Sequence, residues 1–153
     1  LVDAWSVAPY EGDSSEFGSF GDYLDRYSEM TGADGPEGFQ EYYDKVYEDL
    51  LESVRGLPVQ VWRMSTSEFF DTYARAGRPH PPDWVYVDAS HSRDGALADL
   101  RGARDILGGS GTIYGDDFGN REGVTHAVTQ FAIDEGLEID LLGDNQYRME
   151  LAT

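Results

Sequence analysis

The pattern of apolar and polar positions over residues 84–115 predicts a strand, a helix and a second strand. The run 84–87 is aromatic and β-branched, which is typical of a strand covered on both faces. Ser92 can cap a helix, and apolar residues then recur at helical spacing until a Gly-Gly pair ends the pattern. A second short apolar run follows over 112–115. A crossover helix of this length favours two parallel strands.

The pattern on either side of this unit predicts further elements. Helices are expected over 36–55, 67–77 and 121–135. Strands are expected over 1–5, 59–64, 137–142 and 146–151, the last two as an antiparallel hairpin. Asn120 is the expected cap of the last helix. The segment 7–35 is polar with interleaved aromatic residues, and it is interpreted either as an active-site lid or as a surface insertion.

Acidic residues follow both strands of the central unit. Asp88 and His91 come after the first strand, and Asp116 and Asp117 come after the second. Ligands of an open parallel sheet bind outside the carboxyl ends of its strands. Neighbouring strands lie about 4.8 Å apart, so these carboxylates can reach one cation at oxygen distances of about 2.0 to 2.6 Å. The alternative interpretation is that they are helix caps and solvated loop acids of a very acidic protein.

Composition excludes several classes of partner and chemistry. Eleven Lys and Arg residues stand against 30 Asp and Glu residues, a formal net charge of -19, which argues against nucleic-acid phosphate as a partner. The absence of cysteine excludes disulfides and thiolate chemistry. No apolar run approaches the roughly 20 residues of a membrane span, and no signal-peptide pattern opens the chain. A cytoplasmic protein without membrane contact is therefore expected.

The two acidic turns also carry a family resemblance. YVDASH at 86–91, then a helix, two glycines, a strand and GDDFG at 115–119, resemble the carboxyl half of the class I S-adenosylmethionine-dependent methyltransferases. The nearest branch is the metal-dependent O-methyltransferases of sugars and macrolides, of the macrocin and mycinamicin type. The resemblance implies a single α/β domain over 1–153 with a Rossmann-like, doubly wound, mostly parallel sheet and an antiparallel C-terminal edge strand.

The resemblance assigns roles to individual residues. It implies a divalent cation, Mg²⁺ first, held by Asp88, Asp116 and Asp117, and His91 as general base, so that Asp88 and His91 are the catalytic candidates. Asp3 matches the acid that accepts hydrogen bonds from the cofactor ribose, and the alternative interpretation is an ordinary loop acid. The resemblance places the adenosine of the cofactor near Ser65 and Ser67, which makes both residues candidate contacts. Helix capping is a simpler interpretation of the same two residues.

The expected reaction is methyl transfer from S-adenosylmethionine to a hydroxyl of a small polar molecule, such as a sugar or natural product. The family's first strand and glycine-rich turn are expected upstream of Leu1. Two other interpretations stay open: a metal-assisted hydrolase, and a Rossmann-like binding domain without catalytic activity. Assembly as a homo-oligomer is left open as well.

Overall fold

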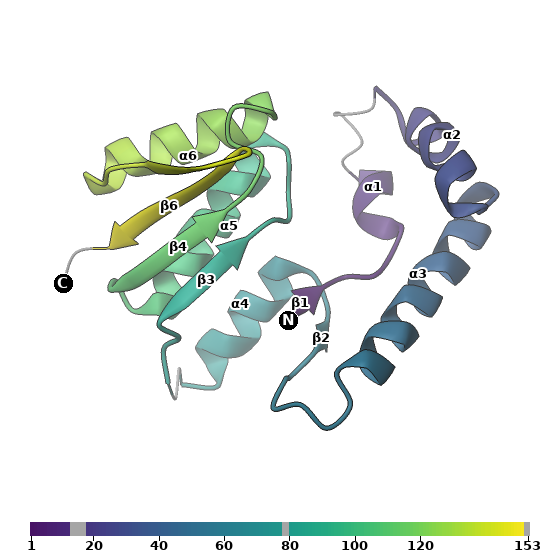
Figure 1. The fold of residues 1–153 in the computed structure, drawn as a ribbon, viewed down its shortest axis with the longest axis horizontal. Coiled ribbons are helices and arrows are strands. Elements are labelled where there is room, and N and C mark those ends of the chain that lie inside the picture. The colour runs from purple at the N-terminus through teal and green to yellow at the C-terminus, as the bar shows by residue number, and fades with distance from the viewer. Residues whose placement is uncertain (13–17, 78–79, 152–153) are drawn as a thin grey trace. The chain divides into compact units, whose positions relative to one another are not determined.

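The computed structural model describes residues 1–12, 18–77 and 80–151. These form two compact units, 1–65 and 66–153, each of which is described by itself (Figure 1). In this described part the chain is a mixed α/β protein with six helices and two small sheets. None of the described helices has the length and apolar character needed to cross a membrane.

The first unit combines a two-stranded parallel sheet with helices. Its elements are β1 (Val2–Asp3), α1 (Ala8–Gly12), α2 (Phe20–Thr31), α3 (Gly35–Ser53) and β2 (Trp62–Arg63). Val2 pairs with Trp62 in the sheet. Phe39 of α3 and Tyr23 of α2 are almost fully buried and pack with Val7 and Ala33 in a small core.

Helices α1 and α2 lie in the segment 7–35, for which the sequence predicted either an active-site lid or a surface insertion. The Ser19 hydroxyl caps α2 by accepting a hydrogen bond from the Asp22 amide at 3.1 Å. The ring of Tyr10 in α1 stacks on that of Tyr23 in α2, with centroids 4.2 Å apart. The aromatic residues therefore form the core of this unit. Residues 13–17 of the segment lie outside the described part.

The second unit contains the remaining elements of the chain. They are α4 (Thr66–Arg75), β3 (Trp84–Val87), α5 (Arg93–Leu107), β4 (Gly111–Gly115), α6 (Glu122–Glu135), β5 (Asp140–Gly143) and β6 (Gln146–Leu151). The four strands form one sheet in the order β3-β4-β6-β5. The expected parallel pairing of β3 with β4 is confirmed. Strand β6 runs antiparallel to both of its neighbours, so the other three strands point the same way.

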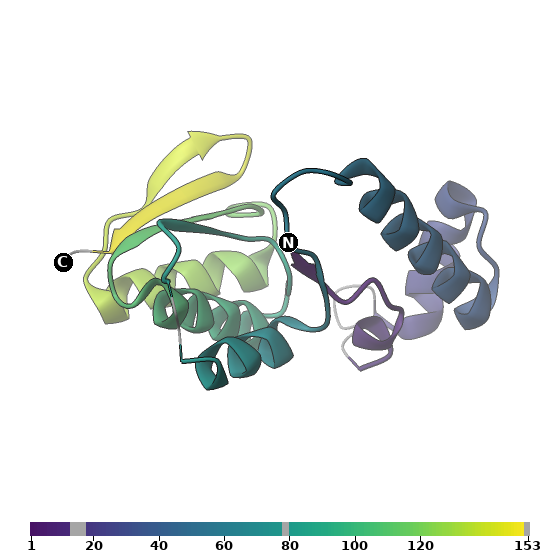
Figure 2. The same ribbon diagram turned by 90° about the horizontal axis from the view of Figure 1, so that it is seen from below.

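Helices α5 and α6 cover one face of this sheet (Figure 2). Leu100 of α5 and Phe131 of α6 are buried against Ile113 and Met149 of the strands. The alternation along β3 points Val85 toward this core, while Trp84, on the opposite face, is 60% exposed. The helical stripes predicted for both helices are thus the ones that pack on the sheet.

Several predicted details are wrong, each for a local reason. Strand β6 is antiparallel as expected but lies between β4 and β5, so β5 is the edge strand. Strand β5 begins only at Asp140, because the Leu137 amide bonds to the Ala132 carbonyl as part of the α6 C-cap. Asn120 is not the cap of α6, which begins after Arg121. The strand expected over 59–64 pairs with β1 only at Trp62 and Arg63, the two residues of β2.

Candidate functional site

Two turns at the carboxyl ends of β3 and β4 form the candidate site. Asp88 directly follows β3, and Asp116 and Asp117 directly follow β4. Val87 and Gly115, the last residues of the two strands, pair with each other in the sheet. The parallel register therefore brings both acidic turns to the same edge of the sheet, as the sequence predicts.

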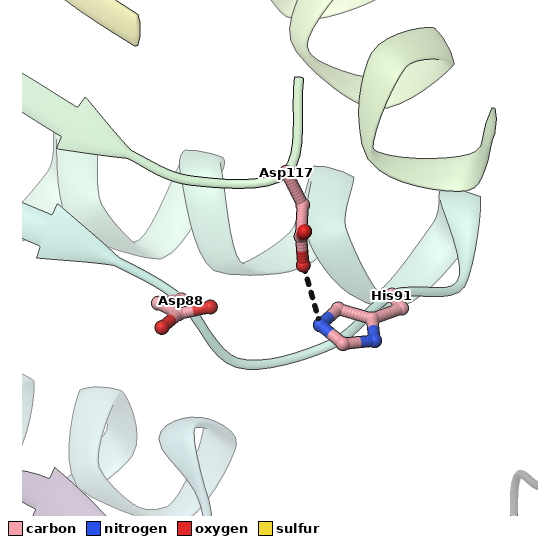
Figure 3. Close-up of side chains that lie close together, drawn as sticks. All are labelled: Asp88, His91 and Asp117. Carbon is pink, nitrogen blue, oxygen red and sulfur yellow. Dashed lines mark ion pairs between the residues drawn. The ribbon is translucent and has the colours of Figure 1, made fainter. Parts of the chain in front are cut away.

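Three of the predicted side chains converge there (Figure 3). Asp88, His91 and Asp117 each offer a ligand atom, and these atoms lie within 4.8 Å of one another. His91 Nε2 lies 2.9 Å from Asp117 Oδ2. Two neighbouring ligands of an octahedral ion at about 2.1 Å would be roughly 3 Å apart, and two opposite ligands roughly 4 Å. The spacing and the oxygen-rich donor set therefore fit a divalent cation.

Asp117 is held in position by its backbone and by its neighbours. Its φ of 66° lies in the left-handed region, which non-glycine residues rarely adopt and in which Asp is enriched. Its carbonyl accepts hydrogen bonds from the amides of Asn120 and Arg121 at 3.1 and 3.0 Å. The Asn120 side chain donates to Asp117 Oδ1 at 3.2 Å. The turn before α6 therefore aims Asp117 Oδ2 at His91.

Asp116 lies in the same pocket but turns to other partners. Its Oδ1 accepts a hydrogen bond from the Asp117 amide at 2.7 Å. Its Oδ2 lies 3.5 Å from the hydroxyl of Tyr86, to which Gln146 Nε2 donates at 3.2 Å. The three-ligand cluster therefore contains His91 in the place that the sequence assigned to Asp116.

A buried carboxylate on α5 anchors the turn after β3. Asp99 is only 5% exposed. It accepts hydrogen bonds from the Thr66 hydroxyl at 2.6 Å and from the Ser90 amide at 3.2 Å. Burial raises the pKa of Asp99, and the hydrogen bonds from Thr66 and Ser90 partly offset that rise. This residue ties the turn that carries Asp88 and His91 to the start of α4 and to the middle of α5.

Two glycines let the same turn lie close to helices α5 and α6. A Cβ on Gly95 would lie 2.1 Å from the Ser90 hydroxyl oxygen. A Cβ on Gly123 would lie 2.2 Å from the carbonyl oxygen of His91. Neither position has room for a side chain, so the first turns of both helices fix the path of residues 88–92.

The space lined by these residues is small. Asp88, His91, Asp116, Asp117 and Tyr147 are among its lining residues, and its volume is about 10 Å³. That is about the room that one water molecule or a single ion needs. The space is therefore too small for an organic substrate, and Asp88 is an exposed member of its lining.

The predicted cofactor residues lie apart from this cluster in the sequence. Asp3 ends β1 in the first unit, where its Oδ1 accepts a hydrogen bond from the Trp5 amide at 2.7 Å. Trp5 has a φ of 42°, in the left-handed region, so the Asp3 carboxylate stabilises a strained turn. Ser65 is the last residue of the first unit, and Ser67 is the second residue of α4 in the second unit.

Sequence reasoning missed Asp99 and Tyr147. Asp99 lies on the inward stripe of α5 beside Leu100, and an acid on an apolar stripe was a signal that could have been used. Tyr147 follows the apolar alternation of β6, and no signal distinguishes its hydroxyl from an ordinary core tyrosine. The glycine at 123 carries no signal either, because its role depends on a segment about 30 residues away.

No protein-family model matches the sequence, and no curated protein matches it either.

Proposed function

We propose that this protein is an S-adenosylmethionine-dependent methyltransferase that methylates a hydroxyl of a small polar molecule, such as a sugar or natural product, with the help of a divalent cation, Mg²⁺ first. The observation that carries the proposal is the convergence of Asp88, His91 and Asp117 at the ends of two neighbouring parallel strands. This is the position at which open α/β sheets bind their ligands.

The strand pairing supports a Rossmann-like sheet. The order of such a sheet is 3-2-1-4-5-6. The parallel pair β1 and β2 corresponds to strands two and three of that order. Strands β3, β4 and β5 correspond to strands four, five and six, with β6 inserted antiparallel between the last two. Taken unit by unit, the pairing is compatible with an α/β fold and supports the proposal of a Rossmann-like one.

The side chains of the site have two proposed roles: the aspartates hold the cation, and His91 accepts a proton. Asp88 and Asp117 would hold the cation, with Asp116 beside them. A bound cation lowers the pKa of a hydroxyl that it ligates. His91 lies beside the cation position with Nε2 2.9 Å from Asp117 Oδ2, and its imidazole would be the base that accepts the substrate proton. Asp117 then stabilises the imidazolium, as the carboxylate of a His–Asp pair does.

The first unit supports the cofactor side of the proposal through Asp3. Oδ1 of the Asp3 carboxylate accepts a hydrogen bond from the Trp5 amide. In the described part of the chain no hydrogen bond to Oδ2 is present, and this oxygen is the one that would accept a ribose hydroxyl. When bound, S-adenosylmethionine would supply the methyl group for the substrate oxygen, and Asp3 would hold its ribose.

Calorimetric titration of S-adenosylhomocysteine into the full-length protein tests the cofactor assignment. Binding in the micromolar range is expected with Mg²⁺ present, and a repeat with EDTA measures how far it depends on the cation. A folded protein that binds no S-adenosylhomocysteine contradicts the proposal. In that case metal-assisted hydrolysis is the next candidate, since the same three groups can activate a water.

Asp117→Asn tests the cation site. It removes the charge that faces His91, and we expect the affinity for Mn²⁺, measured by electron paramagnetic resonance, to fall at least about tenfold. The matched control is Asp105→Asn, an exposed acid near the other end of α5. Equal Mn²⁺ affinity of both variants and the wild type would remove Asp117 from the metal site.

A further inference from the structure

Tyr147 of β6 has a hydroxyl that reaches the acidic site from the core side of the sheet. Its side chain is 1% exposed and packs in the core between the sheet and α5 and α6. The hydroxyl lies over Gly115, the last residue of β4, where a Cβ would lie 2.3 Å from the hydroxyl oxygen. Tyr147 also lines the pocket together with Asp88, His91 and Asp116. Glycine at position 115 therefore makes the room in which this hydroxyl reaches the ends of the strands.

The hydroxyl of Tyr147 belongs to an almost fully buried side chain that lines the pocket. Within residues 1–12, 18–77 and 80–151 it makes no hydrogen bond to another protein group, and it is not one of the buried atoms cut off from any partner. Burial raises the pKa of Tyr147, and the carboxylate of Asp88 raises it further, so the group is a neutral O–H donor at every physiological pH. Because this O–H group lines the pocket, it can donate a hydrogen bond to an oxygen atom held there.

The carboxylates of the site leave a role for such a hydrogen-bond donor. Asp88, Asp116 and Asp117 offer only acceptor atoms when ionised. Such a set binds cations and O–H donors, but it cannot donate to the lone pair of an oxygen. The O–H group of Tyr147 complements the carboxylates in a space of about 10 Å³, the size of one oxygen-bearing group.

We propose that Tyr147 is a ligand-binding residue of this site, whose hydroxyl donates a hydrogen bond to an oxygen atom held beside Asp88, His91 and Asp117. The oxygen is that of a water molecule on the bound cation. This inference rests on the proposed function, because it requires a ligand in the acidic pocket. It adds to that function a donor that fixes where the ligand oxygen sits.

Tyr147→Phe tests the inference, because it removes only the hydroxyl. The matched control is Tyr114→Phe, which removes a hydroxyl from β4 on the opposite face of the same sheet. Two quantities are measured for the wild type and both variants: the midpoint of urea unfolding in EDTA, and the dissociation constant for Mn²⁺ alone.

The inference predicts different effects on stability and binding. The unfolding midpoint of Tyr147→Phe in EDTA stays close to that of the wild type, because the hydroxyl makes no hydrogen bond within the described part of the fold. Its Mn²⁺ dissociation constant rises about tenfold, as for other groups that support a metal site through a hydrogen bond. Tyr114→Phe changes neither quantity.

Three outcomes overturn the inference, and they are distinguishable. A lower unfolding midpoint for Tyr147→Phe than for Tyr114→Phe means that the hydroxyl is bonded within the fold. An unchanged Mn²⁺ affinity of Tyr147→Phe, with a wild type that binds Mn²⁺, overturns the role of Tyr147 and leaves the proposed function standing. A wild type that binds no Mn²⁺ removes the cation from the proposed function and the ligand contact with it.

Discussion

Gly123→Ala displaces the candidate site without touching any of its functional groups. Gly123 is the second residue of α6, and a Cβ there would lie 2.2 Å from the His91 carbonyl oxygen and 2.9 Å from the Arg93 amide nitrogen. Both neighbours are backbone atoms, which cannot rotate away as a side chain can. The turn that carries Asp88 and His91 must therefore move by about 1 Å to restore van der Waals contact.

The expected size of the effect follows from that displacement. Overpacking of this kind costs about 1 to 3 kcal/mol in the free energy of unfolding. A shift of about 1 Å in a catalytic group costs up to roughly 100-fold in function. We expect urea unfolding to show the modest loss of stability, and Mn²⁺ titration to show at least about a tenfold loss of affinity.

Gly102→Ala is the matched control. A Cβ on Gly102 would lie 2.2 Å from the ring of Phe70, so the clash has the same size, but it falls between α5 and α4. We expect this variant to lose stability while it keeps the Mn²⁺ affinity of the wild type. Wild-type Mn²⁺ affinity in Gly123→Ala would refute the reasoning that α6 fixes the position of His91.

Two further predictions concern stability. Asp99→Asn can still make two hydrogen bonds if its Oδ1 accepts from the Ser90 amide and its Nδ2 donates to the Thr66 hydroxyl, which then acts as acceptor. Because burial raises the pKa of Asp99 in the folded state, only the wild type must bury a charge as pH rises. We expect the variant to gain stability relative to the wild type from about pH 4 upward, through the pKa of the folded state, in urea unfolding at stepped pH; a constant difference contradicts this. Phe39→Ala removes a side chain that is 1% exposed in the core of the first unit, and it should cost about 3 to 5 kcal/mol in urea unfolding. Tyr42→Ala, an exposed position on the same helix, should cost far less, and equal losses would contradict the assignment of that core.

The segment from β3 through α5 to β4 could be predicted from the sequence because its capping, periodicity and turn signals are local. Ser92 caps α5 as expected, accepting a hydrogen bond from the Gly95 amide at 3.2 Å. Gly108 ends the helix with a φ of 69°, the left-handed conformation in which glycine is favoured. The order of capping residue, apolar stripe and terminal glycine fixes the boundaries of such an element within a few residues.

Helix α2 was hidden from the same reasoning. Its polar composition suggested a surface segment, although Tyr23, Leu24 and Tyr27 follow helical spacing and Ser19 caps it. The rings of Tyr10 and Tyr23 reach their stacked arrangement only when α1 and α2 come together. Aromatic residues spread through a polar segment thus became a core through tertiary contacts.

For the site, the sequence by itself determined which acids end the two neighbouring strands, because strand direction follows from the length of the crossover helix. It therefore brought Asp88, His91, Asp116 and Asp117 to one edge of the sheet. Only the tertiary structure decided that His91 pairs with Asp117 and that Asp116 turns toward Tyr86. It also decided that Asp99 bonds to the turn after β3 and that Tyr147 lines the pocket. The physical reason is that a strand end places a Cα, whereas the direction of a side chain and its hydrogen bonds depend on packing with residues distant in sequence.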